Sequence, residues 1–275
     1  AGTVTGYTNG VDNRVITSSG TTTLNGETNF IYNGTLVGAG ATGASADLGD
    51  GVHVRTSDSG ATVNANFDEF VAESSGNAGL SILAATDGYA GICFGDSGDN
   101  QIGSVIYYHG DNSMQINTST AIGIRIEGDG AVTKPRQPAF YAEISGGNQD
   151  NIAINTPVTV LLNSEVFDIG DNFASNTFTA PVTGKYHFSV KLACNNVDAA
   201  ASYYDLILST SNKAIYLGSW AFNGYSADAT YFALVGSCTC DMDTSDTAVV
   251  TLTQGGGTAQ TDLNNGTYMT GHLVC

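Results

Sequence analysis

The chain has 275 residues and carries 26 acidic side chains against 8 basic ones, which gives a formal net charge of −18 at pH 7. A basic face cannot be built from so few cations, so we exclude nucleic acid and anionic lipid as charge-driven partners. Charged residues make up 12% of the chain and apolar residues 41%, a composition that fits a folded protein and not a disordered one. The sequence has no apolar run long enough for a spanning helix, so we expect no membrane insertion.

Short strands joined by tight turns dominate the sequence from its start. Apolar and polar residues alternate over short runs, and Asn-Gly or Asp-Gly dipeptides such as Asn25-Gly26, Asp87-Gly88 and Asn265-Gly266 interrupt them. These dipeptides tolerate the positive φ angles of tight hairpins. Helical periodicity is nearly absent, and residues 66–73 fit a short helix and a strand equally well. The prediction is therefore an all-β protein built mainly of hairpins.

Three zones follow one another along the chain. Residues 1–55 are rich in Gly and Thr with few large apolar side chains, so they predict a thin shaft whose copies share one core. Residues 56–133 predict a repetitive hairpin domain, with strands at 80–83, 92–94, 102–108, 114–116 and 122–126. The segment 134–138 holds two of the four prolines and predicts a linker. Residues 134–275 then form a head domain, a β-sandwich with strands near 139–144, 159–162, 184–192, 204–209, 214–218, 231–239, 248–253 and 268–274.

The head carries a motif with a clear physical meaning. In the run from Phe178 to Phe188, FTAPVTGKYHF, Pro181 and Gly184 turn the chain while Tyr186 and Phe188 point to one face of a strand. Together with Pro138-Ala139-Phe140, Phe167 and the final run YMTGHLV, this region resembles the C1q/TNF-like jelly roll. The resemblance covers about half of the chain. It implies a tight homotrimer that binds ligands and does not act as an enzyme, and the spacing around Phe167 and Phe173 departs from the family pattern.

The first half resembles the tail-fibre-like virion proteins of phages. The resemblance is carried by DNRVIT from Asp12, by the turn GDSGDN from Gly95, and by HGDNSM from His109. It implies a trimeric fibre that is assembled in the host cytoplasm and exposed on the virion, with the N-terminal segment attached to other virion proteins. No signal peptide is visible at the start, so the leader was removed, the chain is a fragment, or the protein leaves its cell by lysis.

Catalytic and redox patterns are weak. The four histidines, His53, His109, His187 and His272, are scattered along the sequence, and we interpret each of them as structural. No serine lies in a G-x-S-x-G elbow, and no pair of carboxylates is distinguished by its spacing. The five cysteines form no metal-binding pattern, which favours free and largely buried thiols.

Two groups of residues are candidates for binding. Trp220, Phe222 and Tyr225, with Asp228 nearby, combine flat apolar faces with polar groups, as recognition of a sugar or a protein requires. The alternative is that these aromatic residues belong to the core or to a subunit interface. The loop that contains Asp241, Asp243 and Asp246 is rich in oxygen ligands and predicts a Ca²⁺ site, although Asp is also common in ordinary turns of β proteins.

The interpretation that follows is a non-enzymatic phage virion fibre whose C-terminal head drives homotrimer formation and binds a glycan or protein on the host surface. A purely structural capsid or tail decoration fibre and a bacterial extracellular adhesin are the alternatives. A glycan depolymerase is the least supported function.

Overall fold

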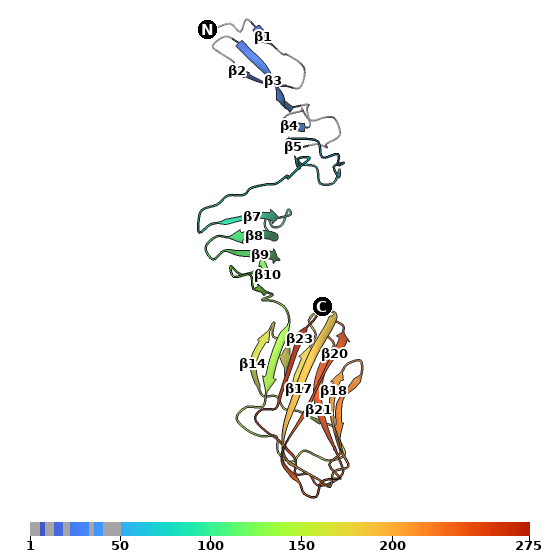
Figure 1. The fold of residues 1–275 in the computed structure, drawn as a ribbon. Coiled ribbons are helices and arrows are strands. Elements are labelled where there is room, and N and C mark those ends of the chain that lie inside the picture. The colour runs from blue at the N-terminus through green and yellow to red at the C-terminus, as the bar shows by residue number, and fades with distance from the viewer. Residues whose placement is uncertain (1–5, 9–13, 19–22, 33–35, 41–50) are drawn as a thin grey trace. The chain divides into compact units, whose positions relative to one another are not determined.

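The computed structural model describes residues 6–8, 14–18, 23–32, 36–40 and 51–275, with side chains from residue 51 onward. The chain divides into two compact units, Ala1–Leu83 and Ala84–Cys275, and Figure 1 shows their strands. Every regular element in the described part is a β-strand, which confirms the all-β prediction. Within the same part, no helix is both long and apolar enough to cross a bilayer.

The first unit contains one mixed sheet. Its strand order is β1-β3-β4-β5-β6, with β2 paired to β3, and the last three strands are parallel neighbours. The sheet continues through β6, so the domain division predicted after residue 55 passes between two paired strands. Residues 66–73, which the sequence left open, contain a strand and no helix. The strands are β1 (Gly6–Thr8), β2 (Arg14–Ser18), β3 (Thr23–Tyr32), β4 (Leu36–Gly40), β5 (Gly51–Arg55) and β6 (Phe70–Glu73).

The second unit begins with an antiparallel meander that confirms the predicted hairpins. The predicted strand at 80–83 is wrong, because this segment forms no strand and pairs with none of the described strands. The turn from β9 to β10 consists of Ser119 and Thr120, which both have positive φ angles of 48° and 61°. Such a turn normally takes Asn and Gly, so residue type alone does not predict it here. The strands are β7 (Tyr89–Phe94), β8 (Gly103–Tyr108), β9 (Ser113–Thr118), β10 (Ala121–Ile126) and β11 (Val132–Thr133).

The head is a sandwich of two antiparallel sheets (Figure 1). One has the order β14-β12-β23-β17-β20 with β22 beside β17, and the other has β15-β16-β21-β18-β19 with β13 beside β21. This order, in which strands distant in sequence become neighbours, is a jelly roll and confirms the predicted fold. The strands are β12 (Ala139–Glu143), β13 (Val158–Thr159), β14 (Ser164–Ile169), β15 (Phe173–Ala174), β16 (Thr177–Thr179), β17 (Gly184–Val197), β18 (Tyr203–Thr210), β19 (Ala214–Trp220), β20 (Ala229–Met242), β21 (Thr247–Gly255), β22 (Asp262–Leu263) and β23 (Tyr268–Leu273).

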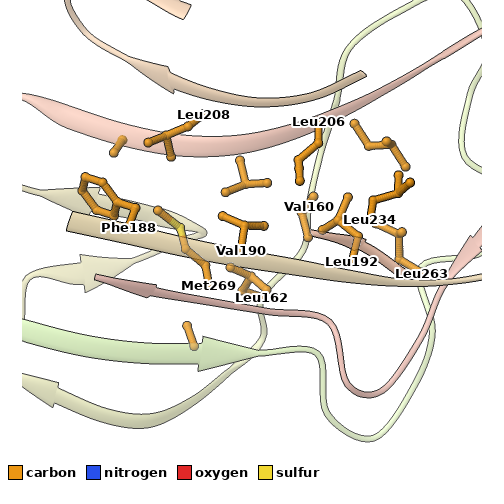
Figure 2. Close-up of a cluster of buried hydrophobic side chains, with 14 of the residues drawn as sticks. Val160, Leu162, Phe188, Val190, Leu192, Leu206, Leu208, Leu234, Leu263 and Met269 are labelled. Atoms are coloured by element: carbon orange, nitrogen blue, oxygen red, sulfur yellow. The ribbon is translucent and has the colours of Figure 1, made fainter. Parts of the chain in front are cut away.

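The core of the head lies between these two sheets. Phe140 stacks on Phe178 with ring centroids 5.0 Å apart, and Phe188 meets Phe178 edge to face at 5.6 Å. Aliphatic side chains from both sheets fill the rest of the interior (Figure 2). Tyr186 points inward as predicted and donates its hydroxyl proton to the carbonyl of Val182 over 2.7 Å. The motif residues therefore hold the sandwich together.

One glycine of the final strand is required by packing. A Cβ atom on Gly271 would lie 2.5 Å from the ring of Phe140 and 2.7 Å from that of Phe188. Because the two rings close over the backbone of β23, any larger residue would force them apart. This explains the glycine in the run YMTGHLV.

The five cysteines all lie in the described part of the chain, and none of them is paired. Cys194 is buried in the core, and burial raises the pKa of its thiol to about 12. Cys238 and Cys240 both point inward from β20, as their spacing predicts, and burial raises the pKa of Cys240 to about 11. Cys93 and Cys275 are exposed, so the prediction of buried thiols holds fully for Cys194 and in part for Cys238 and Cys240.

Candidate functional site

A polar depression of about 530 Å³ opens at one end of the head. β12 starts with Ala139 opposite His272, so the chain enters the head at the C-terminal end of β23. β17 runs from that end to the other, where Asn195 pairs with Tyr231 and Asp262. The depression therefore lies at the end of the sandwich farthest from the point where the chain enters. Its lining consists of Asp150, Asn151, Asn196, Asp228, Ala229, Thr230, Gln260 and Asp262.

Backbone and amide groups orient the carboxylates of this depression. Asp228 accepts hydrogen bonds from the backbone N–H of Ala199 and from the side chain of Gln260, both over 2.8 Å. These donors, the backbone N–H first, lower the pKa of Asp228. Asp262 accepts from the backbone N–H of Asn151 at 2.8 Å and from the side chain of Asn196 at 2.9 Å. These hydrogen bonds hold both carboxylates in place.

Two asparagines of the lining adopt a left-handed backbone. The φ angles are 53° at both Asn151 and Asn196, a conformation that asparagine tolerates better than most other residues. Asn151 lies in the loop between β12 and β13, and Asn196 is the second last residue of β17. Asparagine at these two positions therefore allows the backbone to turn and places both amide groups in the lining of the depression. Carboxylates beside amides can accept and donate hydrogen bonds to a ligand rich in hydroxyl groups.

The structure divides the four predicted ligand-binding residues into two pairs. Phe222 is 2% exposed and meets Tyr204 and Phe232 edge to face, and Trp220 packs against the same core. Both follow the alternative interpretation, in which such residues build the core. Tyr225 is 59% exposed in the loop between β19 and β20, and Asp228 lines the depression. Whether these two bind a ligand stays a prediction.

The predicted Ca²⁺ loop is a turn whose aspartates have different partners. Asp246 accepts from the backbone N–H of Asp243 at 2.8 Å and from the side chains of Ser211 and Asn212. These donors lower the pKa of Asp246, the backbone N–H most. Asp241 forms an ion pair with Lys185 instead. Among the described residues, no three acidic, histidine or cysteine side chains converge as metal ligands, so this structure does not gather Asp241, Asp243 and Asp246 around one point.

A second surface appears on the meander of β7 to β11, where burial is opposite to that of an ordinary half-buried sheet. Strand register places Ile92, Val105 and Ile116 in one row across one face, and all three are exposed. The same face carries further exposed apolar side chains, which are Phe94, Met114, Ile126 and Val132. A continuous apolar face of this kind is rare on monomeric proteins and marks an interaction surface.

The opposite face of the meander is more buried and carries polar side chains beside Ile106 and Tyr108. Ser104, Ser113 and Gln115 are all less than a tenth exposed. Gln115 donates to the hydroxyl of Ser113 at 3.2 Å, and Asn117 donates to that of Ser104 at 2.9 Å. Polar groups on this face therefore pair with each other in part, whereas the apolar side chains of the other face stay exposed.

The sheet of the first unit repeats this arrangement. In β5, Val52 and Val54 are exposed while His53 and Arg55, which alternate with them, are buried. His53 Nε2 lies 3.1 Å from a carboxylate oxygen of Glu73, and Arg55 Nε lies 3.3 Å from the same oxygen. The polar network is therefore internal and the apolar side chains point outward. The sequence showed the alternation but not which face would be covered.

Comparison with known proteins gives structural likenesses only. Neither a protein-family model nor a curated protein sequence matches the chain. Among solved structures, the globular domain of zebrafish complement 1qA protein is 19% identical, with a TM-score of 0.35 over 50% of this chain and 98% of that one. Murine APRIL is 10% identical (TM-score 0.37; 50% and 99%), and Eiger TNF from S. frugiperda is 11% identical (TM-score 0.39; 52% and 94%). The jelly-roll assignment itself comes from the strand order described above.

Proposed function

We propose that this chain is a non-enzymatic, homotrimeric fibre protein of a phage virion, with the sandwich as a head that binds the host surface. The observation that carries the proposal is the exposed apolar face of β7 to β11. Full burial of an Ile, Val, Phe or Met side chain stabilises a protein by about 1.5–3 kcal/mol. Each half-exposed side chain on this face would thus gain about 1 kcal/mol from a partner.

A second and a third copy of this chain are the occupants that we propose for the face. The same inverted burial occurs in β5 and β6, so two sheets of one chain both lack a partner for their apolar sides. Copies of the same chain can cover each of these sheets, because a closed symmetric assembly brings the same surface of every copy together. The number three comes from the resemblance of the sequence to C1q-like heads and to phage fibres, which form trimers.

The head is the part that we assign to binding. Its polar depression faces away from the point where the chain enters, as a contact at the tip of a fibre requires. A lining of carboxylates and amides suits a glycan, whose hydroxyl groups both donate and accept hydrogen bonds. Three heads on one fibre would bind multivalently, so each single contact could be weak.

The test combines mass and binding measurements on the full chain. Light scattering should give the mass of a trimer, and the fluorescently labelled trimer should bind saturably to at least one strain in a panel of bacteria. Asp228→Asn together with Asp262→Asn should weaken that binding without changing the mass. A trimer that binds no strain would favour a structural decoration fibre, and a secretion signal encoded upstream would favour an adhesin. A monomeric chain would overturn the proposal.

A further inference from the structure

Two histidines that are distant in the sequence lie side by side on the head. His187 on β17 and His272 on β23 are direct partners in the antiparallel register. Their ring centroids are 5.6 Å apart with an angle of 54° between the rings. Both alternate with core residues such as Phe188 and Gly271, so their side chains point away from the core. The sequence places them in separate segments, and only the strand register brings them together.

The neighbours of the pair leave room for a ligand and fix one ring. Ala139 follows in the same row on β12, and Thr239 lies on the other side on β20. The Thr239 hydroxyl oxygen lies 3.0 Å from Nδ1 of His187. When Nδ1–H donates to that oxygen, Nε2 carries the free lone pair of the neutral ring. A hydrogen bond on one ring nitrogen is the usual arrangement when the other nitrogen binds a metal.

In the described residues, no acidic side chain forms an ion pair with either of these two imidazoles. On the same face, Lys185 and Asp241 form an ion pair with each other. In the described part of the chain, the only histidine with a carboxylate partner is His53. The net charge of −18 also attracts cations to the surface of the protein.

We propose that His187 and His272 together bind one divalent transition-metal ion such as Zn²⁺. Imidazole is a preferred ligand of zinc, copper and nickel, whereas Ca²⁺ prefers oxygen. An ion about 2.0–2.1 Å from one nitrogen of each ring would lie about 3 Å from each ring centre, so rings up to about 6 Å apart can share it. Water or a side chain of a second copy completes the coordination. The site is independent of the glycan depression and of the proposed virion function.

Isothermal titration of the full chain with Zn²⁺, in a buffer that does not bind metals, tests the site. The unchanged chain should bind about one ion per copy. Loss of an outer-shell partner lowers metal affinity roughly 10- to 100-fold. His187→Gln and His272→Gln each remove a direct ligand, so each should lower the Zn²⁺ affinity by at least that much. His109→Gln is the matched control and should leave the affinity unchanged. Thermal unfolding without metal must show that all variants fold.

A gain of affinity provides the second readout. Thr239→His would place a third imidazole in register with the first two, so Zn²⁺ should bind more tightly than to the unchanged chain. Excess Ca²⁺ should not displace the zinc. If His187→Gln or His272→Gln binds Zn²⁺ as tightly as the unchanged chain, or if His109→Gln weakens binding equally, the assignment is wrong.

Discussion

A charge placed in the middle of the exposed apolar face tests whether that face is a shared core. Ile116 lies on β9 between Val105 and Ile124 and is 42% exposed in the single chain. Ile116→Glu should therefore cost little in a separate chain, because the longer side chain can reach water. In an assembly the same carboxylate would be buried in every copy, and the effective cost of a buried ion is several kcal/mol.

The expected magnitude follows from these two terms. A loss of roughly 3 kcal/mol per chain would lower the association constant of a trimer on the order of 10⁶-fold, since 1.4 kcal/mol is a factor of ten. The midpoint concentration of trimer dissociation should then rise roughly a thousandfold, because it varies as the square root of that constant. Sedimentation velocity over a dilution series measures this midpoint.

Val182→Glu is the matched control for this experiment. Val182 is also β-branched and is 45% exposed, but it lies in the loop between β16 and β17 of the head. It should leave the dissociation midpoint unchanged. Equal midpoints for Ile116→Glu and the unchanged chain would refute the shared core, as would an equal effect of both variants.

Three further predictions concern the head and the cysteines. Tyr204→Phe should destabilise the head by about 1–3 kcal/mol in chemical denaturation, because the buried hydroxyl accepts the backbone N–H of Asp198 at 2.9 Å. Hydrogen bonds lower the pKa of Asp246 below its ordinary 3.8, so its contribution is present above that pH and is lost as the pH falls through the folded pKa. In Asp246→Asn, the melting temperature should therefore fall less on acidification below about pH 4 than it does in the unchanged chain. Cys93 should react with a thiol reagent at pH 8 while Cys194, buried and with a pKa of about 12, reacts only after unfolding.

Sequence patterns predicted most of the fold because the long strands alternate regularly. β17 and β20 place large apolar residues inward over much of their length, and the motif around Tyr186 marks the start of the first. β14 was not predicted. It is an edge strand that pairs only with β12, and the burial of its side chains does not alternate along the strand. A strand was predicted at 159–162. The structure has a strand of two residues there, Val158–Thr159, which pairs with β21. Strands defined mainly by their neighbours carry little local signal.

The binding surfaces were harder to predict than the fold. Asp228 was the only lining residue of the depression identified from the sequence, because the others come from separate loops that the sandwich brings to one end. In the Asp241 loop, closeness in sequence did not predict which side chains meet. Its aspartates are near one another in the chain, yet the side chains that bond to Asp246 are those of Ser211 and Asn212 on another hairpin. Likewise, only the register of β17 and β23 joins His187 to His272.

The two halves of the chain satisfy the same physical rule in different ways. The core of the head begins at Phe140 and ends at Met269, and its apolar side chains are covered within one chain. In β5 and in the meander, polar groups pair with each other on one face while Val52, Ile92 and their neighbours stay exposed. Alternation predicts a strand in both cases, but it does not state which face water reaches. If copies supply the missing cover, then Ile116→Glu should separate the chains and leave the melting of the head unchanged, because no part of the head core depends on that face.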